Sequence, residues 1–412
     1  MKSSNSPSYL CIAADTYPPA RVDVTVLFGR EMADRGHEID WLLQSEAECD
    51  TNTEQIWNGW RVFVGATDLG SSLFRRIHKH ILGLSNDFKV FQLAKFNHYD
   101  FIQVKDKFLS ALFGIIAAKK NKCGFVYWLS YPFPEASIYE SRVGTARYRI
   151  LYFIRGVIFK FLLYRVILPR ADHVFVQSEQ MKIDVTSQGI SSSKISAVPM
   201  GYSPEDMELI QYPSMDEEQC AIVYIGTLLK TRRLDFLVRV LAQVRHQMSN
   251  VTLYMIGPEE LPGDMTVLLD EAKRLSVTDH LVMTGPVSRS LALGYVSRSR
   301  VCVSPFYPTP ILNSTSPTKL VEYMAVGRPV VANDHPEQQR VISKSGGGVC
   351  VPYSEKDFAD AIIELLNHPE VAERMGEMGA KYVRKERTYS SIADRVEEQY
   401  SSLVRELRNR NH

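Results

Sequence analysis

The sequence has few cysteines, and no pair of them stands at a spacing that would hold a metal ion. No CxxC occurs, and no cysteine lies at a paired spacing with a histidine. The six cysteines are scattered at Cys11, Cys49, Cys123, Cys220, Cys302 and Cys350. This pattern gives no indication of a zinc site, and it is typical of reduced thiols in a cytoplasmic protein.

The chain also lacks long apolar runs and an excess of one charge. Its first apolar run, Tyr9 to Ala14, is too short for a signal peptide and predicts a β-strand. No uninterrupted apolar stretch reaches the roughly 20 residues that span a bilayer. The formal net charge is +1, so the composition gives no reason to expect a nucleic acid as partner.

The composition that is present suits two globular domains. Hydrophobic residues make up 45% and charged residues 23% of the chain, which are values of a soluble globular protein. A length of 412 residues exceeds one ordinary core and fits two domains of near-equal size.

Short apolar strands alternate with helices in the first half of the chain, and the pattern then restarts. The strands expected first are 9–15, 38–43, 61–65, 99–105, 124–130 and 171–178. The strands expected later are 220–227, 251–257, 280–287, 300–305, 329–333 and 346–352. This alternation predicts a parallel, doubly wound sheet in each half. No GxGxxG follows a strand, so the dinucleotide-binding fingerprint is absent.

The same pattern predicts the domain boundaries. We expect an N-terminal Rossmann-like domain at 1–206 and a polar, proline-containing linker at 207–219. A C-terminal Rossmann-like domain follows at 220–388. The last helix, within 389–412, is expected to cross back and pack on the first domain.

The stretch "SPTKLVEYMAVGRPVVAND" predicts a short helix with an anion-binding tip. Ser316 is a good N-cap, and Pro317 fits the first helical position because its missing N–H costs nothing there. The backbone N–H groups that follow lack intrahelical partners and carry the positive end of the helix dipole, which suits a phosphate. These groups belong to Thr318, Lys319 and Leu320.

Glu322 lies one turn further along the same helix face, because it follows Thr318 by four residues. A carboxylate there can accept two hydrogen bonds from the vicinal diol of a ribose. Phosphate at the tip and ribose on the carboxylate together describe a nucleoside diphosphate. The alternative is an ordinary, partly exposed glutamate.

A basic loop follows the first strand of the second half, at the carboxyl end where open α/β sheets bind ligands. Its cations can clamp a diphosphate through charge-assisted hydrogen bonds. They are Lys230, Arg232 and Arg233. The alternative is three solvated charges in front of a helix.

At this point the chain resembles a known family, the retaining GT-B glycosyltransferases of the "group 1" or GT4 type. The resemblance runs from about 171 to 385 and rests on segments in order: "ADHVFVQSEQMK", "VPMGYSPE", "YIGTLLKTRRLDFLV", "LYMIGPE", "LVMTGPVSRSLALGYVSRSRVCVSPF", "PTKLVEYMAVGRPVVAND" and "GGGVCVPYSEKDFADAI". It implies a GT-B fold, with two Rossmann-like domains facing a cleft. It also implies a nucleotide-diphosphate sugar of UDP or GDP type in the C-terminal domain and an acceptor in the N-terminal domain. Transfer with retention and without a metal or other cofactor is implied as well, and the absence of Asp-x-Asp agrees with that.

The resemblance also implies roles for individual residues. Glu322 matches the second glutamate of a Glu-x7-Glu motif, which holds the ribose, and Arg232 matches a diphosphate-binding lysine. These two are expected to be the catalytic residues. The expected donor-binding set is Thr227, Lys230, Arg232, Arg233, Ser314, Thr318, Lys319, Leu320 and Glu322. The expected acceptor-side set is Tyr17, Arg21, Asp106 and Ser130.

Four positions depart from the family pattern. Ser314 stands where the first glutamate is usual, and Thr227 stands where an arginine is usual after Gly226. Ser130 replaces a histidine after the strand "FVYWLS". The sequence "TYPPARVD" replaces a Gly-Gly loop after the first strand.

Two segments of the first half are basic. Residues 141–171 contain seven basic and no acidic side chains, but the charges ring the helix instead of forming one face. Residues 73–84 place Leu73, Phe74, Ile77, Ile81 and Leu84 in one stripe opposite a basic face. Contact with an anionic inner-membrane surface is expected through Arg75, Arg76 and Lys79. The alternative for both segments is an ordinary helix that covers the sheet.

Two functions of different class follow. The first is a glycosyltransferase of surface polysaccharide or glycolipid synthesis that uses a glycan or a polyprenyl- or lipid-linked acceptor. It would work in the cytoplasm, peripherally at the cytoplasmic face of the membrane. The alternative is a non-catalytic GT-B subunit that binds a nucleotide or a partner glycosyltransferase. A sugar-nucleotide epimerase of similar fold is a weaker third hypothesis.

Overall fold

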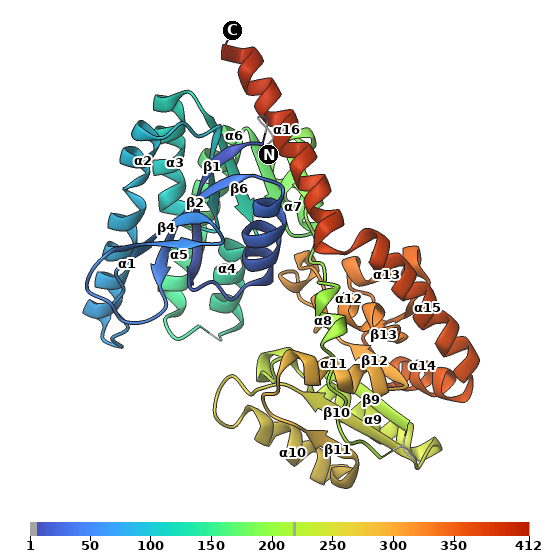
Figure 1. Ribbon diagram of the computed structural model, residues 1–412. Helices are drawn as coiled ribbons and strands as arrows, with labels where there is room; N and C mark the ends of the chain where they lie inside the picture. Colours follow the sequence, from blue (N-terminus) through green and yellow to red (C-terminus); the bar gives the residue numbers. More distant parts are fainter. Residues whose placement is uncertain (1–5, 145, 217–219, 412) are drawn as a thin grey trace. The chain divides into compact units, whose positions relative to one another are not determined.

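The computed structural model describes residues 6–144, 146–216 and 220–411, and the chain forms two compact α/β units (Figure 1). The first unit combines the chain up to Pro199 with the segment that begins at Tyr389. The second unit is Met200–Thr388. The predicted two-domain α/β architecture is therefore confirmed.

The first unit is built on a mostly parallel sheet. Its strand order is β3-β4-β2-β1-β5-β6-β7-β8, and only the β3–β4 pair among the described strands is antiparallel. The strands are β1 (Ser8–Tyr17), β2 (Glu38–Ser45), β3 (Thr53–Trp57), β4 (Trp60–Gly65), β5 (Phe101–Lys105), β6 (Gly124–Leu129), β7 (His173–Val176) and β8 (Ile195–Ala197). The hairpin of β3 and β4 was not predicted.

Helices connect these strands and cover the sheet. They are η1 (Asp23–Met32), α1 (Leu73–Asp87), α2 (Val90–Phe96), α3 (Phe108–Asn121), α4 (Phe133–Val143), α5 (Arg149–Phe161), η2 (Leu162–Ile167), α6 (Leu168–Arg170), α7 (Glu179–Ser187), η3 (Ser192–Lys194) and α16 (Tyr389–Asn411).

The first sheet is buried on both faces, as expected of parallel strands with near-continuous apolar runs. Successive residues of β1 point to opposite faces. Leu10 and Ile12 join a core with Ala111 of α3, whereas Tyr9 joins a second core with residues of η1 and α16. α16 contributes Tyr389, Ile392, Ala393, Val396, Tyr400, Leu403 and Val404 to this second core.

The second unit is a fully parallel α/β sheet in the strand order β11-β10-β9-β12-β13-β14. Its strands are β9 (Cys220–Ile225), β10 (Val251–Ile256), β11 (Leu281–Met283), β12 (Val301–Ser304), β13 (Val330–Asn333) and β14 (Gly348–Val351). Its helices are α8 (Glu205–Glu208), η4 (Lys230–Arg232), α9 (Asp235–Gln247), α10 (Asp264–Arg274), η5 (Thr278–His280), α11 (Arg289–Arg298), η6 (Leu312–Ser314), α12 (Thr318–Ala325), α13 (Pro336–Ser345), α14 (Glu355–Asn367) and α15 (Pro369–Glu386).

The segment 200–206 belongs to the second unit, whereas the sequence boundary was drawn after 206. Local hydrogen bonds explain this placement. Met200 N–H donates to Ser316 Oγ at 2.9 Å, and Tyr202 N–H donates to the Arg387 carbonyl at 2.9 Å. Residues 217–219 of the predicted linker lie outside the described residues.

Helix α1 does not cover the sheet with its apolar stripe. Phe74, Ile77 and Ile81 are exposed, while the buried positions are Asn86 and Asp87. Asn86 Nδ2 donates to the carbonyls of Leu43 and Phe63, so a polar side chain attaches this helix to β2 and β4. Helix α1 thus packs on the sheet through its C-terminal part, while the predicted apolar stripe faces solvent, and the side chain of Leu73 lies outside the description.

No helix among the described residues is both long enough and apolar enough to cross a membrane.

Candidate functional site

Helix α12 is fixed to the end of strand β9 in the second unit. The hydroxyl of the fully buried Tyr323 accepts a hydrogen bond of 2.7 Å from the backbone N–H of Ile225, the last residue of β9. Leu320, Val321 and Met324 are buried in the core beneath. The apolar face of the predicted helix thus holds it at the carboxyl end of the sheet, where ligands of such folds bind.

The N-terminal end of α12 differs from the prediction in its N-cap residue, and its first backbone N–H groups remain uncapped by that residue. Pro317, not Ser316, is the N-cap residue, and its side chain makes no capping hydrogen bond. The hydroxyl of Ser316 instead accepts from Met200 N–H. The first-turn N–H groups, which include those of Thr318 and Lys319, therefore keep their capacity to bind an anion.

Three side chains converge beside this tip, over Gly226. A Cβ atom at Gly226 would lie 3.2 Å from Arg232 Nη1, 3.2 Å from Tyr224 Oη and 3.3 Å from Lys319 Nζ. Gly226 has φ +146°, which favours glycine. Lys319 Nζ donates to Tyr224 Oη at 3.0 Å. The glycine therefore leaves room where two cations and a phenol meet.

The electrostatics of this cluster are those of an anion site. Burial lowers the pKa of Lys319, against the effect of the neighbouring Tyr224 hydroxyl. Burial would raise the pKa of Tyr224, but the cations of Lys319 and Arg232 lower it. A negative charge between Arg232, Lys319 and the tip of α12 would stabilise the charged forms of both cations.

Glu322 is buried one turn below the tip, and its carboxylate has a partner that sequence reasoning missed. Arg289, the first residue of α11, lies 2.7 Å from Glu322 Oε1 and 2.9 Å from Asp206 Oδ2. Burial raises the pKa of Glu322, and Arg289 opposes the rise. Arg289 thus orients the carboxylate through one oxygen, and the second oxygen can accept from a ligand hydroxyl.

The other predicted donor-binding residues are dispersed around this cluster. Arg233 pairs with Asp235 at 3.3 Å, while the exposed Lys230 donates its backbone N–H to Asp264. Thr227 is half-buried in the loop after β9. Ser314 and Leu320 are buried.

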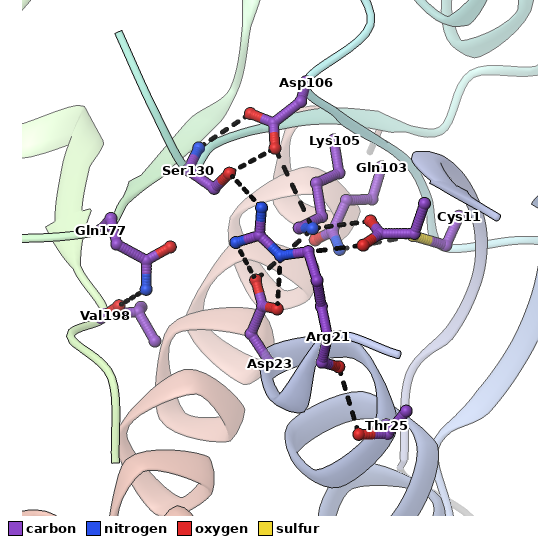
Figure 2. A network of polar contacts seen from close by, with 11 residues as sticks. Cys11, Arg21, Asp23, Thr25, Gln103, Lys105, Asp106, Ser130, Gln177 and Val198 are labelled. Carbon is purple, nitrogen blue, oxygen red and sulfur yellow. Dashed lines mark hydrogen bonds and ion pairs between the residues drawn. The ribbon is translucent and has the colours of Figure 1, made fainter. Parts of the chain in front are cut away.

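A second polar cluster occupies the carboxyl ends of β1, β5 and β6 in the first unit (Figure 2). Ser130 N–H donates to Asp106 Oδ1 at 2.8 Å, and its hydroxyl donates to the other carboxylate oxygen. Arg21 Nη1 donates to Ser130 Oγ at 3.1 Å. Three of the four residues predicted for the acceptor side therefore lie in contact, whereas Tyr17 packs against the core beside them.

Sequence reasoning missed the most buried members of this network. Lys105 is 1% exposed and its Nζ lies 2.7 Å from Asp15 and 3.4 Å from Asp23. Arg21 binds both oxygens of Asp23 at 3.1 Å. A lysine that ends an apolar strand was the available signal, because such a lysine needs buried partners.

Three carboxylates face two cations in this cluster. Burial would lower the pKa of Lys105, but Asp23, Asp106 and Asp15 raise it. Burial raises the pKa of Asp106, against the effects of Lys105 and Ser130. The cluster therefore pairs its two cations internally and holds one carboxyl more than it has cations, a surplus carboxyl.

The described residues contain no group of three or more His, Cys, Asp or Glu side chains placed to hold a metal ion.

These two halves define a two-domain α/β protein whose second sheet carries a cluster of two cations beside the tip of α12. The family model described as "Glycosyltransferase Family 4" matches residues 23–206, and the model "Glycosyl transferases group 1" matches residues 219–368. The chain belongs to the group 1 glycosyltransferases of family 4 and has the GT-B fold. The family and the GT-B fold that the sequence predicts are confirmed.

Curated relatives match about half of the chain. An alpha-D-kanosaminyltransferase of Streptomyces kanamyceticus is 22% identical over 46% of this chain and 47% of its own length. A phosphatidyl-myo-inositol mannosyltransferase of Mycobacterium leprae is 25% identical over 52% of each protein. The chain thus spans about half the length of the curated relatives it matches.

Solved structures match over nearly the whole chain and show the fold. Sucrose-phosphate synthase of Thermosynechococcus elongatus has a TM-score of 0.71 at 18% identity, covering 96% of this chain and 99% of its own. HepE of Anabaena, solved with UDP and glucose, has a TM-score of 0.66 at 14% identity, covering 96% and 100%. WaaG, a glycosyltransferase involved in lipopolysaccharide biosynthesis, has a TM-score of 0.64 at 14% identity, covering 95% and 98%.

Proposed function

We propose that the protein transfers a sugar from a nucleotide-diphosphate sugar to a glycan or lipid-linked acceptor in polysaccharide or glycolipid synthesis. The observation that carries this proposal is the convergence of Lys319 and Arg232 on the open tip of α12, with Glu322 one turn below. A diphosphate fits the two cations and the helix tip, and a ribose fits the carboxylate. HepE of Anabaena, which shares the fold, was solved with UDP and with UDP-glucose.

The same cations would serve the chemical step. When the bond between sugar and diphosphate breaks, negative charge grows on the leaving oxygen, and groups fixed in advance stabilise it most effectively. Arg232, Lys319 and the α12 dipole supply that stabilisation without a metal. We propose transfer of a hexose or related sugar with retention of configuration, in line with the family resemblance.

The acceptor would bind on the first unit, at the cluster of Asp106, Ser130 and Arg21. Its surplus carboxyl suits the hydroxyl groups of a sugar or lipid-linked acceptor. We propose a cytoplasmic protein that contacts an anionic membrane surface through Arg76 and Lys79. Arg75 contributes less to this contact than predicted from sequence, because it pairs with Glu48 and Asp68.

One experiment separates this enzyme from the alternative of a non-catalytic GT-B subunit. Each UDP- and GDP-sugar that stabilises the protein in a thermal-shift screen is incubated with it, and release of the nucleoside diphosphate is measured without acceptor. Slow hydrolysis that Arg232→Ala abolishes and Arg233→Ala leaves intact supports the transferase. Binding without hydrolysis, and without transfer to any lipid extract, supports the binding subunit.

A further inference from the structure

Helix α5 presents a continuous apolar side to solvent. Seven large apolar side chains on it are between 40% and 78% exposed. They are Ile150, Leu151, Phe153, Ile154, Val157, Ile158 and Phe161. At ~100° per residue these positions fall within an arc of about 160°. An exposed apolar patch of this extent on a helix marks an interaction surface.

The opposite side of α5 is firmly packed, so the exposed side does not result from a loosely placed helix. A Cβ at Gly156 would lie 2.7 Å from Ile138 Cγ1 and 2.9 Å from the Pro134 carbonyl of α4. The Phe159 ring stacks on Phe108 of α3 at 4.8 Å. Glycine at this position therefore lets α5 lie close against α4 and fixes which side faces outward.

The basic residues of α5 border the apolar arc. By the same ~100° spacing, Arg149 and Lys160 lie along one edge and Arg155 along the other. The Arg155 guanidinium lies 4.4 Å from the Tyr152 ring centre, and Lys160 pairs with Glu135 at 3.6 Å. The basic residues, which ring the helix in the sequence, therefore lie at the margins of one apolar face. This is the arrangement of a helix that lies in a lipid–water interface.

A second apolar helix lies on the same part of the first unit. A cavity of about 540 Å³ is lined by residues of α1, α3 and α5, among them Leu84, Phe108 and Phe159. α1 therefore borders the same cavity as α5. Its exposed Phe74, Ile77 and Ile81 give α1 an apolar surface of its own.

The charge of α5 and its neighbouring residues favours a lipid surface, rather than a second copy of the chain, as the partner of this apolar side. Residues 142–171 contain no acidic side chain. A symmetric contact between two copies of α5 would bring its basic margins together without acidic partners from that segment. An anionic lipid surface supplies the missing negative charge and accepts the apolar side chains at once.

We propose that α5 inserts its apolar side into an anionic lipid surface, with α1 as a second contact. This inference rests on the membrane contact proposed above and names the element that makes it. It shifts the main contact from the basic side chains Arg75, Arg76 and Lys79 to the apolar side of α5. Insertion uses the apolar area, while the basic margins contact lipid headgroups.

The test compares the triple variant Leu151→Glu, Ile154→Glu and Ile158→Glu with Ile183→Glu, an equally exposed isoleucine on α7. The full-length proteins are sedimented with vesicles of neutral phosphatidylcholine or of its mixture with anionic phosphatidylglycerol. We expect the wild type and Ile183→Glu to bind the anionic vesicles, and the triple variant to bind about tenfold or more weakly. Equal binding of all three proteins, or no binding by the wild type at low salt, would overturn the proposal.

A second readout tests insertion itself. Tryptophan fluorescence of Ile154→Trp, compared with that of Ile183→Trp, should be quenched by brominated anionic lipid only for the α5 variant. A wild-type dimer that the triple variant loses, together with no quenching, would assign the surface to a second copy and overturn the lipid proposal. Nucleotide binding by the triple variant, measured by calorimetry, should equal that of the wild type. Loss of vesicle binding with intact nucleotide binding thus separates this proposal from the donor site.

Discussion

The two units place charged side chains at the carboxyl ends of their strands, but they balance those charges differently. In the first unit, Lys105 and Arg21 contact Asp15, Asp23 and Asp106, so the cations are already neutralised. In the second unit, the described contacts of Lys319 are with the Tyr224 hydroxyl and the rings of Tyr224 and Phe306. An anionic ligand would therefore add the missing negative charge at the second site, whereas the first site already contains its own carboxylates.

This difference assigns opposite ligands to similar sheet edges. A cation without a carboxylate partner gains from a diphosphate, whereas a cation shared among carboxylates would have to give up existing ion pairs to bind one. The first cluster instead suits a neutral, hydroxyl-rich ligand.

The largest change in free energy is expected when the polar cluster around Lys105 in the first unit is disrupted. Lys105→Met should destabilise the protein by about 3–5 kcal/mol, because buried carboxylates lose their cation. Urea denaturation measures this loss, with the exposed Lys120→Met as control. Calorimetry of the folded variant should show unchanged nucleotide affinity. If Lys105→Met lowered nucleotide affinity without destabilising the protein, the assignment of the two sites would be reversed.

The second-largest effect is expected on ligand binding at the cluster of Arg232 and Lys319 in the second unit. Arg232→Ala should weaken nucleoside-diphosphate binding by about 1.5–3 kcal/mol, the worth of a hydrogen bond to a charged group. It should leave nucleoside binding nearly unchanged, because its proposed partner is the diphosphate. Arg233→Ala is the matched control, since that side chain pairs with Asp235. Equal losses for both ligands would remove the diphosphate role from Arg232.

A smaller effect is expected at the ribose position. Glu322→Ala should weaken donor binding by about 1–3 kcal/mol, because polar groups of the ligand lose their acceptor. Asp206→Ala is the control, since it removes the other carboxylate that Arg289 contacts and leaves Glu322 in place. If both variants lost affinity equally, Glu322 would act by holding Arg289 and not by binding ribose.

The smallest effect is expected from a chelator. EDTA should leave transfer activity unchanged, since Arg232, Lys319 and the helix dipole balance the leaving diphosphate. The assay compares initial transfer rates with and without EDTA. Activity that EDTA abolishes and a divalent ion restores would show that the cations do not suffice.

Much of the fold and part of the donor site could be predicted from local sequence. Apolar runs gave strands such as β9 and β10, and the four-residue spacing in α12 placed Glu322 one turn below the tip. The hairpin of β3 and β4 was missed although it turns at Asn58-Gly59, a pair that favours such turns and has positive φ at both residues. Helix α13 was missed because most of its residues are polar.

The remaining site residues could not be predicted, because tertiary structure alone brings them together. Arg289 reaches Glu322 from a different helix, and Lys105 meets Asp15 through the pairing of β5 with β1. The wheel positions of α5 were available from the sequence. Which side faces outward depends on Gly156 packing against α4, and no local pattern encodes that contact.

The proposed donor site depends above all on Glu322, which we propose binds the ribose of a nucleoside diphosphate held at the tip of α12. The most direct test is calorimetry of wild type and Glu322→Ala with the preferred diphosphate and with its 2′,3′-dideoxy analogue. If Glu322 accepts from the ribose hydroxyls, the variant loses affinity for the natural ligand but not for the analogue. We predict a coupling free energy of about 1 kcal/mol or more between the two changes. Equal losses for both ligands, with no coupling, would contradict it.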